Sequence, residues 1–113
     1  MTANLFAKRA WAEAALLAAL LAATPAAAGG IPPDKADGLM GLLVQDCGSC
    51  HGLTMKGGLG PSLLPASLDG KADEALENII LDGVPGTPMP PWRPLLTPEE
   101  AAWIIGKLKE GLK

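Results

Sequence analysis

The sequence predicts an all-α fold of three to four helices joined by loops rich in glycine and proline. In three separate segments, apolar residues recur at intervals of three and four, the period of a helix that buries one face. No strand-like alternation of apolar and polar residues is visible. With 113 residues, the chain is long enough for one small domain.

The first 28 residues are predicted to be an export signal, removed from the mature domain. A positively charged start precedes an unbroken apolar run at residues 14–23, and a proline follows it. The alanines at 26–28 then resemble a signal-peptidase site. The run is short for a membrane-spanning helix, although Glu13 near its start leaves an uncleaved N-terminal anchor as an alternative. Cleavage after residue 28 would leave residues 29–113 as the domain.

This predicted domain is acidic and poor in aromatic residues. It carries seven basic and eleven acidic side chains, a formal net charge of −4. That balance argues against nucleic acid and against an anionic membrane surface as partners. Trp92 and Trp103 are its only aromatic residues. We therefore expect the small core to need a further component, such as a bound cofactor.

A first helix is predicted over residues 34–46. Cys47 follows one turn beyond its apolar face and on the same side. The helix is therefore expected to present Cys47 to whatever packs on that face. The apolar face consists of Ala36, Leu39, Met40 and Leu43.

The next five residues, Cys47-Gly48-Ser49-Cys50-His51, form the C-x-x-C-H pattern that attaches a c-type haem. Two thiols three positions apart on one helical turn can each add to a haem vinyl group, and His51 can then offer its imidazole to the iron. A thioredoxin-like redox pair would need a βαβ setting. A closed zinc site would need a fourth ligand, and a structural disulfide would not require His51. We predict one covalent haem c.

A tightly bent loop is predicted over residues 52–64, because its four glycines oppose a stable helix. Near its end, Pro61 has no N–H but keeps a carbonyl oxygen. Placed beside the imidazole, that oxygen would accept the Nδ1 proton of His51 and orient the ring. The alternative is that Pro61 only stiffens a turn.

A second helix is predicted over residues 73–81. Asp73 and Glu74 suit its first turn, and Gly83 suits the position just past its end. Its buried face is predicted to consist of Leu76, Ile79 and Ile80.

Five prolines within residues 85–94 exclude a helix or a central strand there. Met89 stands between two of them, which would hold its thioether at a fixed place. A thioether is the usual sixth ligand opposite histidine in electron-transfer haems. The alternative is that Met89 fills a gap in the core. Met55 is expected to stay on the His51 side, and Met40 belongs to the first helix.

The last helix has a clear start. Thr97 is a good N-cap, Pro98 suits the first turn, and Glu100 completes a capping box. Lys107 and Lys109 favour the C-terminal end. The apolar face is predicted to consist of Ala101, Ile104, Ile105, Leu108 and Leu112.

Taken in order, the haem motif, the Gly-Pro turn, the proline-bracketed methionine and the terminal helix resemble the class I cytochrome c family. In this small fold, three to four helices and their loops wrap around one haem. The resemblance covers essentially all of residues 29–113. By position it implies thioether bonds at Cys47 and Cys50, iron ligation by His51 and Met89, and orientation of His51 by Pro61.

Three runs, at residues 46–54, 57–61 and 86–93, are together similar to the NirC group of small periplasmic cytochromes, which are encoded with the cytochrome cd nitrite reductase of denitrifying bacteria. This similarity implies a periplasmic monomer that carries single electrons to nitrite reductase or another periplasmic redox protein. An assembly factor for the d-type haem of that reductase is one alternative. A ligand-sensing haem protein is another. Because two strong ligands would leave no open position on the iron, we expect no enzyme activity.

Two residues depart from the class. Leu43 stands where an aromatic residue is often found, and Lys107 stands where a tyrosine is often found. The helix crossing that usually locks this fold is therefore expected to be looser here. Arg93 is expected to pair with a haem propionate, to face a partner, or to remain a solvated surface charge.

Overall fold

A computed structural model describes residues 30–113 of the chain, of which residues 31–113 form one compact unit. The predicted export signal at residues 1–28 lies outside the described residues. Every regular element in the described part is helical, as predicted. None of these helices has the length and apolar character needed to cross a membrane.

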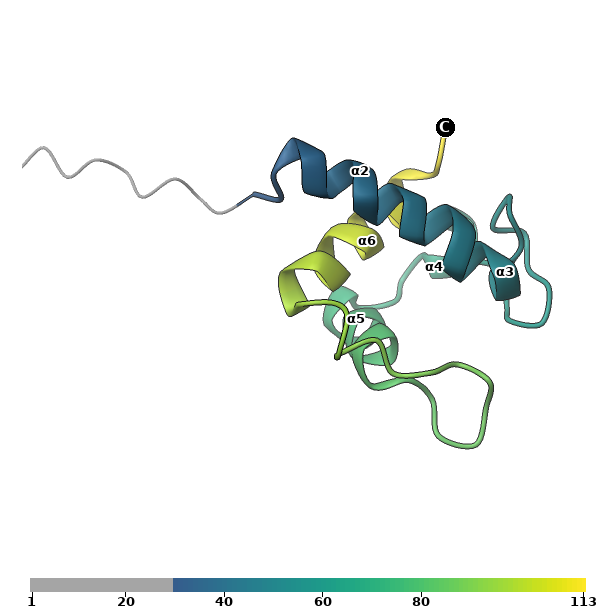
Figure 1. Ribbon diagram of the computed structural model, residues 1–113. Coiled ribbons are helices and arrows are strands. Elements are labelled where there is room, and N and C mark those ends of the chain that lie inside the picture. Colours follow the sequence, from purple (N-terminus) through teal and green to yellow (C-terminus); the bar gives the residue numbers. More distant parts are fainter. Residues whose placement is uncertain (1–29) are drawn as a thin grey trace, which may run out of the picture. The chain divides into compact units, whose positions relative to one another are not determined.

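The first helical segment runs unbroken from Pro33 to His51. It consists of α2 (Pro33–Leu42), the π-helical turn η2 (Leu43–Cys47) and α3 (Gly48–His51). The predicted end at residue 46 is therefore too early, because Gly48 keeps helical φ and ψ angles and the backbone leaves the helix only at Gly52, whose φ is +88°. Figure 1 shows the segment as one long helix with α3 at its far end. The whole C-x-x-C-H motif thus lies on helical backbone.

Two shorter helices follow the glycine-rich loop. The single turn α4 (Pro65–Leu68) was not predicted, although the proline at its first position is a typical start signal. In contrast, α5 (Asp73–Asp82) matches its predicted span to within one residue. Its end at Gly83, where φ is +69°, is also as predicted.

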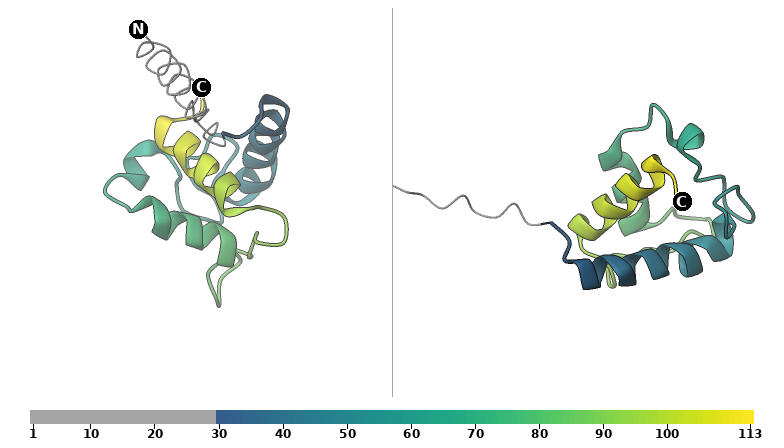
Figure 2. Two further views of the ribbon diagram at one scale, coloured as in Figure 1. Left: turned by 90° about the vertical axis from the view of Figure 1, so that its left-hand side faces the viewer. Right: turned by 90° about the horizontal axis from the view of Figure 1, so that it is seen from above.

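The last helix, α6 (Pro98–Glu110), is the centre of the packing. It contacts α2, α4 and α5, and the left view of Figure 2 shows it running between α2 and α5. Its predicted capping box is present, and the predicted apolar residues Ala101, Ile104, Ile105 and Leu108 are buried. Leu112 was also predicted on this face, but it lies beyond the end of α6 at Glu110 and is only partly buried. The buried apolar core comprises Leu39, Leu43, Met55, Leu68, Leu81, Leu96, Ala101, Ile104, Ile105 and Leu108.

The prediction of which face of α5 is buried is partly wrong. Ile79 was expected to be buried but is 42% exposed, whereas Leu81 is only 3% exposed. Two positions on an α-helix are roughly 200° apart around its axis, so these side chains point in nearly opposite directions. The face that α5 buries therefore passes through Leu81, with Leu76 and Ile80 half-buried beside it.

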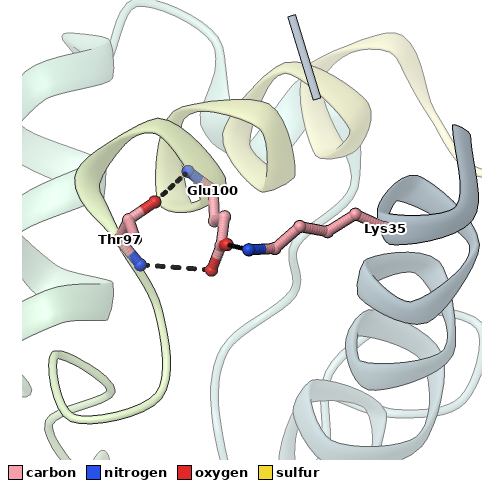
Figure 3. A network of polar contacts seen from close by, with 3 residues as sticks. All are labelled: Lys35, Thr97 and Glu100. Carbon is pink, nitrogen blue, oxygen red and sulfur yellow. Dashed lines mark hydrogen bonds and ion pairs between the residues drawn. The ribbon is translucent and has the colours of Figure 1, made fainter. Parts of the chain in front are cut away.

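An ion pair joins the beginnings of α2 and α6 (Figure 3). Glu100 is only 4% exposed, and one of its carboxylate oxygens pairs with the ammonium group of Lys35. Its other oxygen accepts a hydrogen bond from the Thr97 N–H at 3.1 Å, while Thr97 Oγ1 accepts one from the Glu100 N–H at 3.2 Å. The Lys35 hydrogen bond, followed by that of the Thr97 backbone, lowers the pKa of Glu100. The carboxylate is therefore held in its charged form.

The two residues that depart from the class have different surroundings. Leu43 is fully buried in the core. The ammonium group of Lys107 lies 5.4 Å from the centre of the Trp103 ring and 3.3 Å from a carboxylate oxygen of Glu110. The smaller side chain at Leu43 therefore still packs as a core residue, and Lys107 has an aromatic and an acidic neighbour on its own helix.

Candidate haem site

Both cysteines of the motif are half-buried free thiols on successive helical elements. Cys47 ends η2 and Cys50 lies within α3. Burial, followed by the nearby charge of Asp46, raises the pKa of the Cys47 thiol to about 11. Reactive redox pairs depend on a lowered thiol pKa, so this environment is the opposite of the one a thioredoxin-like pair requires.

The predicted contact between His51 and Pro61 is present. His51 Nδ1 lies 2.7 Å from the Pro61 carbonyl oxygen. A carbonyl oxygen can only accept a hydrogen bond, so Nδ1 carries the proton and Nε2 keeps its lone pair. An imidazole in this tautomer and orientation is suited to bind a metal through Nε2.

The loop after His51 satisfies the last carbonyl groups of α3. The Gly57 N–H donates to the His51 carbonyl at 2.8 Å, and the Gly60 N–H donates to the Cys50 carbonyl at 2.9 Å. These bonds satisfy groups that have no partner within the helix. They also hold the loop, and with it Pro61, against the motif.

Met55 is a core residue of this loop, so its thioether is not exposed to bind iron. Its side chain is 3% exposed, and its backbone has a φ of +60°, which is uncommon for a residue with a side chain. The Leu63 N–H and the Ser62 hydroxyl both donate to its carbonyl oxygen, at 2.9 and 3.2 Å. Met40 also packs against the core.

Met89 differs from these two methionines because it is neither in the core nor packed against it. It is half-buried in the proline-rich segment, which Figure 1 shows as a long loop between α5 and α6. This placement argues against Met89 as a filler of the core. Two hydrogen bonds fix its backbone, from its own N–H to Thr87 Oγ1 at 3.3 Å and from the Val84 N–H to its carbonyl oxygen at 3.2 Å.

The base of the proline-rich loop is closed against the end of α5. The N–H groups of Trp92 and Arg93 donate to the carbonyl oxygens of Ile80 and Leu81, both at 3.0 Å. The loop therefore leaves α5 and returns to it, so that Met89 stands between two anchored ends.

Arg93 has a partner within the chain that the sequence analysis did not consider. Its Nε and Nη2 atoms donate to one carboxylate oxygen of Asp82, at 2.9 and 2.7 Å. The guanidinium group is thus engaged at the base of the loop. Both side chains are more than half exposed, so the pair contributes little to stability.

Gly83 and Gly60 allow close contacts at the site that could not be predicted from the sequence. A Cβ atom at Gly83 would lie 2.8 Å from the Met89 carbonyl oxygen, and one at Gly60 would lie 2.7 Å from the ring of His51. In the sequence, Gly83 marks only the end of a helix and Gly60 only a turn before proline. The way each loop folds back shows what each glycine accommodates.

These donors fit a covalently bound haem. The motif offers two thiols and an imidazole whose Nε2 lone pair is free, and the proline-rich loop offers a thioether outside the core. Within residues 30–113, no group of three or more histidine, cysteine or acidic side chains is arranged to hold a metal ion.

Comparisons with known proteins agree with this chemistry. A family model described as cytochrome C oxidase, cbb3-type, subunit III, matches residues 34–106. The chain is 58% identical over 99 residues to cytochrome c55X of Paracoccus denitrificans, an alignment that covers 86% of this chain and 93% of that protein. It is 56% identical over 70 residues to cytochrome c55X of Pseudomonas aeruginosa, covering 62% of this chain and 59% of that protein.

A solved structure is similar as well. The c-type cytochrome NirC has 49% sequence identity to this chain and superimposes with a TM-score of 0.69, over 70% of this chain and 93% of the NirC chain. The predicted all-α fold and the predicted haem c are therefore both supported by a protein of the same architecture.

Proposed function

The chain belongs to the class I c-type cytochromes and carries a covalent haem c, and on that premise we propose that it is a periplasmic carrier of single electrons with His51 and Met89 as its iron ligands. When bound, the haem supplies an iron that accepts and releases one electron at a time. Cys47 and Cys50 tether the group, which prevents its loss.

The observation that carries this proposal is the 2.7 Å hydrogen bond between His51 Nδ1 and the Pro61 carbonyl oxygen. It holds the ring in one orientation and makes Nε2 a stronger donor. A ligand that keeps one position in both oxidation states requires little rearrangement during electron transfer. This property suits a carrier.

The placement of Met89 supports its role as the second ligand. Its thioether lies outside the core, and its backbone is held by hydrogen bonds to Val84 and Thr87. A thioether raises the reduction potential of a haem relative to a nitrogen ligand. If His51 and Met89 both bind the iron, they would leave no position for a substrate, and we propose that the chain has no catalytic activity of its own.

The ligand assignment is tested by replacing Met89 with leucine, which preserves volume but removes the sulfur. We expect the oxidised protein to lose the absorption band near the red end of the visible spectrum that marks a methionine–iron bond, and its reduction potential to fall. Met40→Leu is the matched control, because Met40 packs against the core. A band that persists in Met89→Leu would remove Met89 from the ligand set.

We propose cytochrome cd nitrite reductase as the electron acceptor, on the strength of the similarity to NirC. The test is capture of partners by the haem-loaded protein from periplasm of cells respiring nitrite. Recovery of the reductase, followed by its reduction by the purified cytochrome, supports the carrier role. If deleting the gene instead leaves the reductase without d-type haem, the assembly role replaces it.

The compartment is a separate part of the proposal and rests on residues 1–28. We expect cell fractionation to recover the protein in the periplasm, with a mass equal to residues 29–113 plus one haem. A membrane-bound product that retains the first 28 residues would support the uncleaved anchor instead.

A further inference from the structure

Gly60 lies directly against the imidazole of His51. A Cβ atom built on Gly60 would lie 2.7 Å from Cε1, 2.8 Å from Nδ1 and 3.2 Å from Nε2 of the ring. Ordinary van der Waals contacts of a Cβ atom are 3.4 to 4 Å. A residue with a Cβ atom therefore has no room at this position while the ring stays where it is.

The backbone conformation of Gly60 does not itself require glycine. Gly60 is not among the residues of positive φ, which in this loop are Gly52, Met55 and Gly57. The left-handed backbone region that favours glycine is therefore not what selects glycine here. The reason for glycine is therefore the contact with the ring.

Neither partner in this contact can move freely. The Gly60 N–H donates to the Cys50 carbonyl at 2.9 Å, and the Gly60 carbonyl accepts from the Gly58 N–H, also at 2.9 Å. Displacing the loop would stretch these bonds and move the adjacent Pro61. Displacing the ring would move Nδ1 from the Pro61 carbonyl oxygen. Either movement, of the loop or of the ring, would disturb the hydrogen bond between His51 and Pro61.

We propose that Gly60 is a positioning residue that sets the location of the His51 imidazole, and through it the donor strength of Nε2. This inference rests on the proposed function, since it takes His51 as an iron ligand. A weaker hydrogen bond at Nδ1 makes the imidazole a poorer donor. A poorer donor stabilises the oxidised iron less, so the reduction potential rises.

The test compares Gly60→Ala with Gly70→Ala in the haem-loaded protein. Gly70 has a φ of +72°, and no atom lies within 4 Å of the Cβ it would carry, so its substitution strains the backbone outside the loop that holds Pro61. We expect Gly60→Ala to shift the g values of the oxidised iron in electron paramagnetic resonance and to raise the reduction potential. Gly70→Ala is expected to lower the unfolding temperature while leaving the g values as in the wild type.

A measurement on the wild-type protein makes the test independent of how the variants fold. In the reduced, haem-loaded protein, we expect a nuclear Overhauser effect between the α protons of Gly60 and the Cε1 proton of His51. Its absence would overturn the inference. So would wild-type g values and potential in Gly60→Ala, or equal shifts in both variants.

Failure of this inference is distinguishable from failure of the proposed function. If the wild-type protein lacks the low-spin signature of histidine and methionine ligation, the proposed function fails and the inference fails with it. If that signature is present but Gly60→Ala leaves it unchanged, only the role of Gly60 is lost.

Discussion

Single glycines decide how closely the backbone segments of this protein approach one another. Gly83 ends α5 with a φ of +69°, and a Cβ there would lie 2.8 Å from backbone atoms of Met89, Pro90 and Pro91. The same residue therefore terminates a helix and admits the segment that holds the proposed ligand. Gly86 also has a positive φ, of +78°, but nothing lies within 4 Å of the Cβ it would carry.

Gly83 and Gly86 both have a positive φ, but only Gly83 faces a neighbouring backbone segment. We expect Gly86→Ala to cost about 1 kcal/mol for its positive φ. Gly83→Ala should cost more, because a φ of +69° with a ψ of −173° is essentially restricted to glycine and because its Cβ would meet the Met89 backbone. It should also lower the temperature at which the methionine–iron band disappears. Denaturant unfolding and thermal loss of that band measure the two effects. Equal losses in both variants would mean that the close approach is unimportant.

At the level of elements, the junction between α2 and α6 depends on one buried carboxylate. Glu100 caps its own helix through Thr97 and crosses to Lys35 at the start of α2. The capping box was predicted from local spacing and is confirmed. The partner on α2 could not be predicted, because 65 positions of sequence separate the two residues and only the tertiary fold brings them together.

The lowered pKa of Glu100 makes this junction sensitive to acid. A carboxyl group whose pKa is lower in the folded state stabilises the protein above its ordinary value of 4.5, and this contribution is lost as pH falls through the lowered folded value. Glu100→Gln keeps the cap but removes the charge, so we expect a loss of about 1 kcal/mol at pH 7.

The measurement is the free energy of unfolding from pH 7 down to pH 3. The difference between wild type and Glu100→Gln should be constant above about pH 5 and should shrink below it. Glu99→Gln is the control, because Glu99 lies on the same helical turn but is exposed. An advantage of the wild type that does not change with pH would contradict the role of the charge.

At the level of the whole molecule, the described part of the chain has a thin core. Its ten buried apolar residues include no aromatic side chain, and Trp92 and Trp103 are only partly buried against them. A domain of this size rarely folds on such a core without a covalent or bound addition. The haem is expected to serve as that addition.

We therefore expect the protein with Cys47→Ala and Cys50→Ala, which cannot be tethered to haem, to lose cooperative unfolding. Binding and folding are coupled when the bound group completes the core. Circular dichroism should show reduced helix content and loss of the near-ultraviolet signal from the two tryptophans. A cooperative transition at the wild-type denaturant concentration would show that the polypeptide core is sufficient.

Local patterns predicted the parts of the site that depend on neighbours in sequence. The C-x-x-C-H motif, the capping box of α6 and the end of α5 at Gly83 all follow from residues within one or two helical turns. The contact of His51 with Pro61 was one of two alternatives, and it is present because the intervening loop folds back on α3. The roles of the ligands themselves stay predictions.

By itself the sequence determined the helical class, the cofactor chemistry and most helix boundaries, because period, caps and motif spacing act over a few residues. Only the tertiary structure decided which face of α5 is buried, which partner neutralises Glu100, and which glycines make room for the ring of His51 and the backbone of Met89. Lys35 and Glu100 are 65 positions apart, and the two glycine contacts, although only nine and six positions apart, depend on how each loop folds back, which no local pattern encodes.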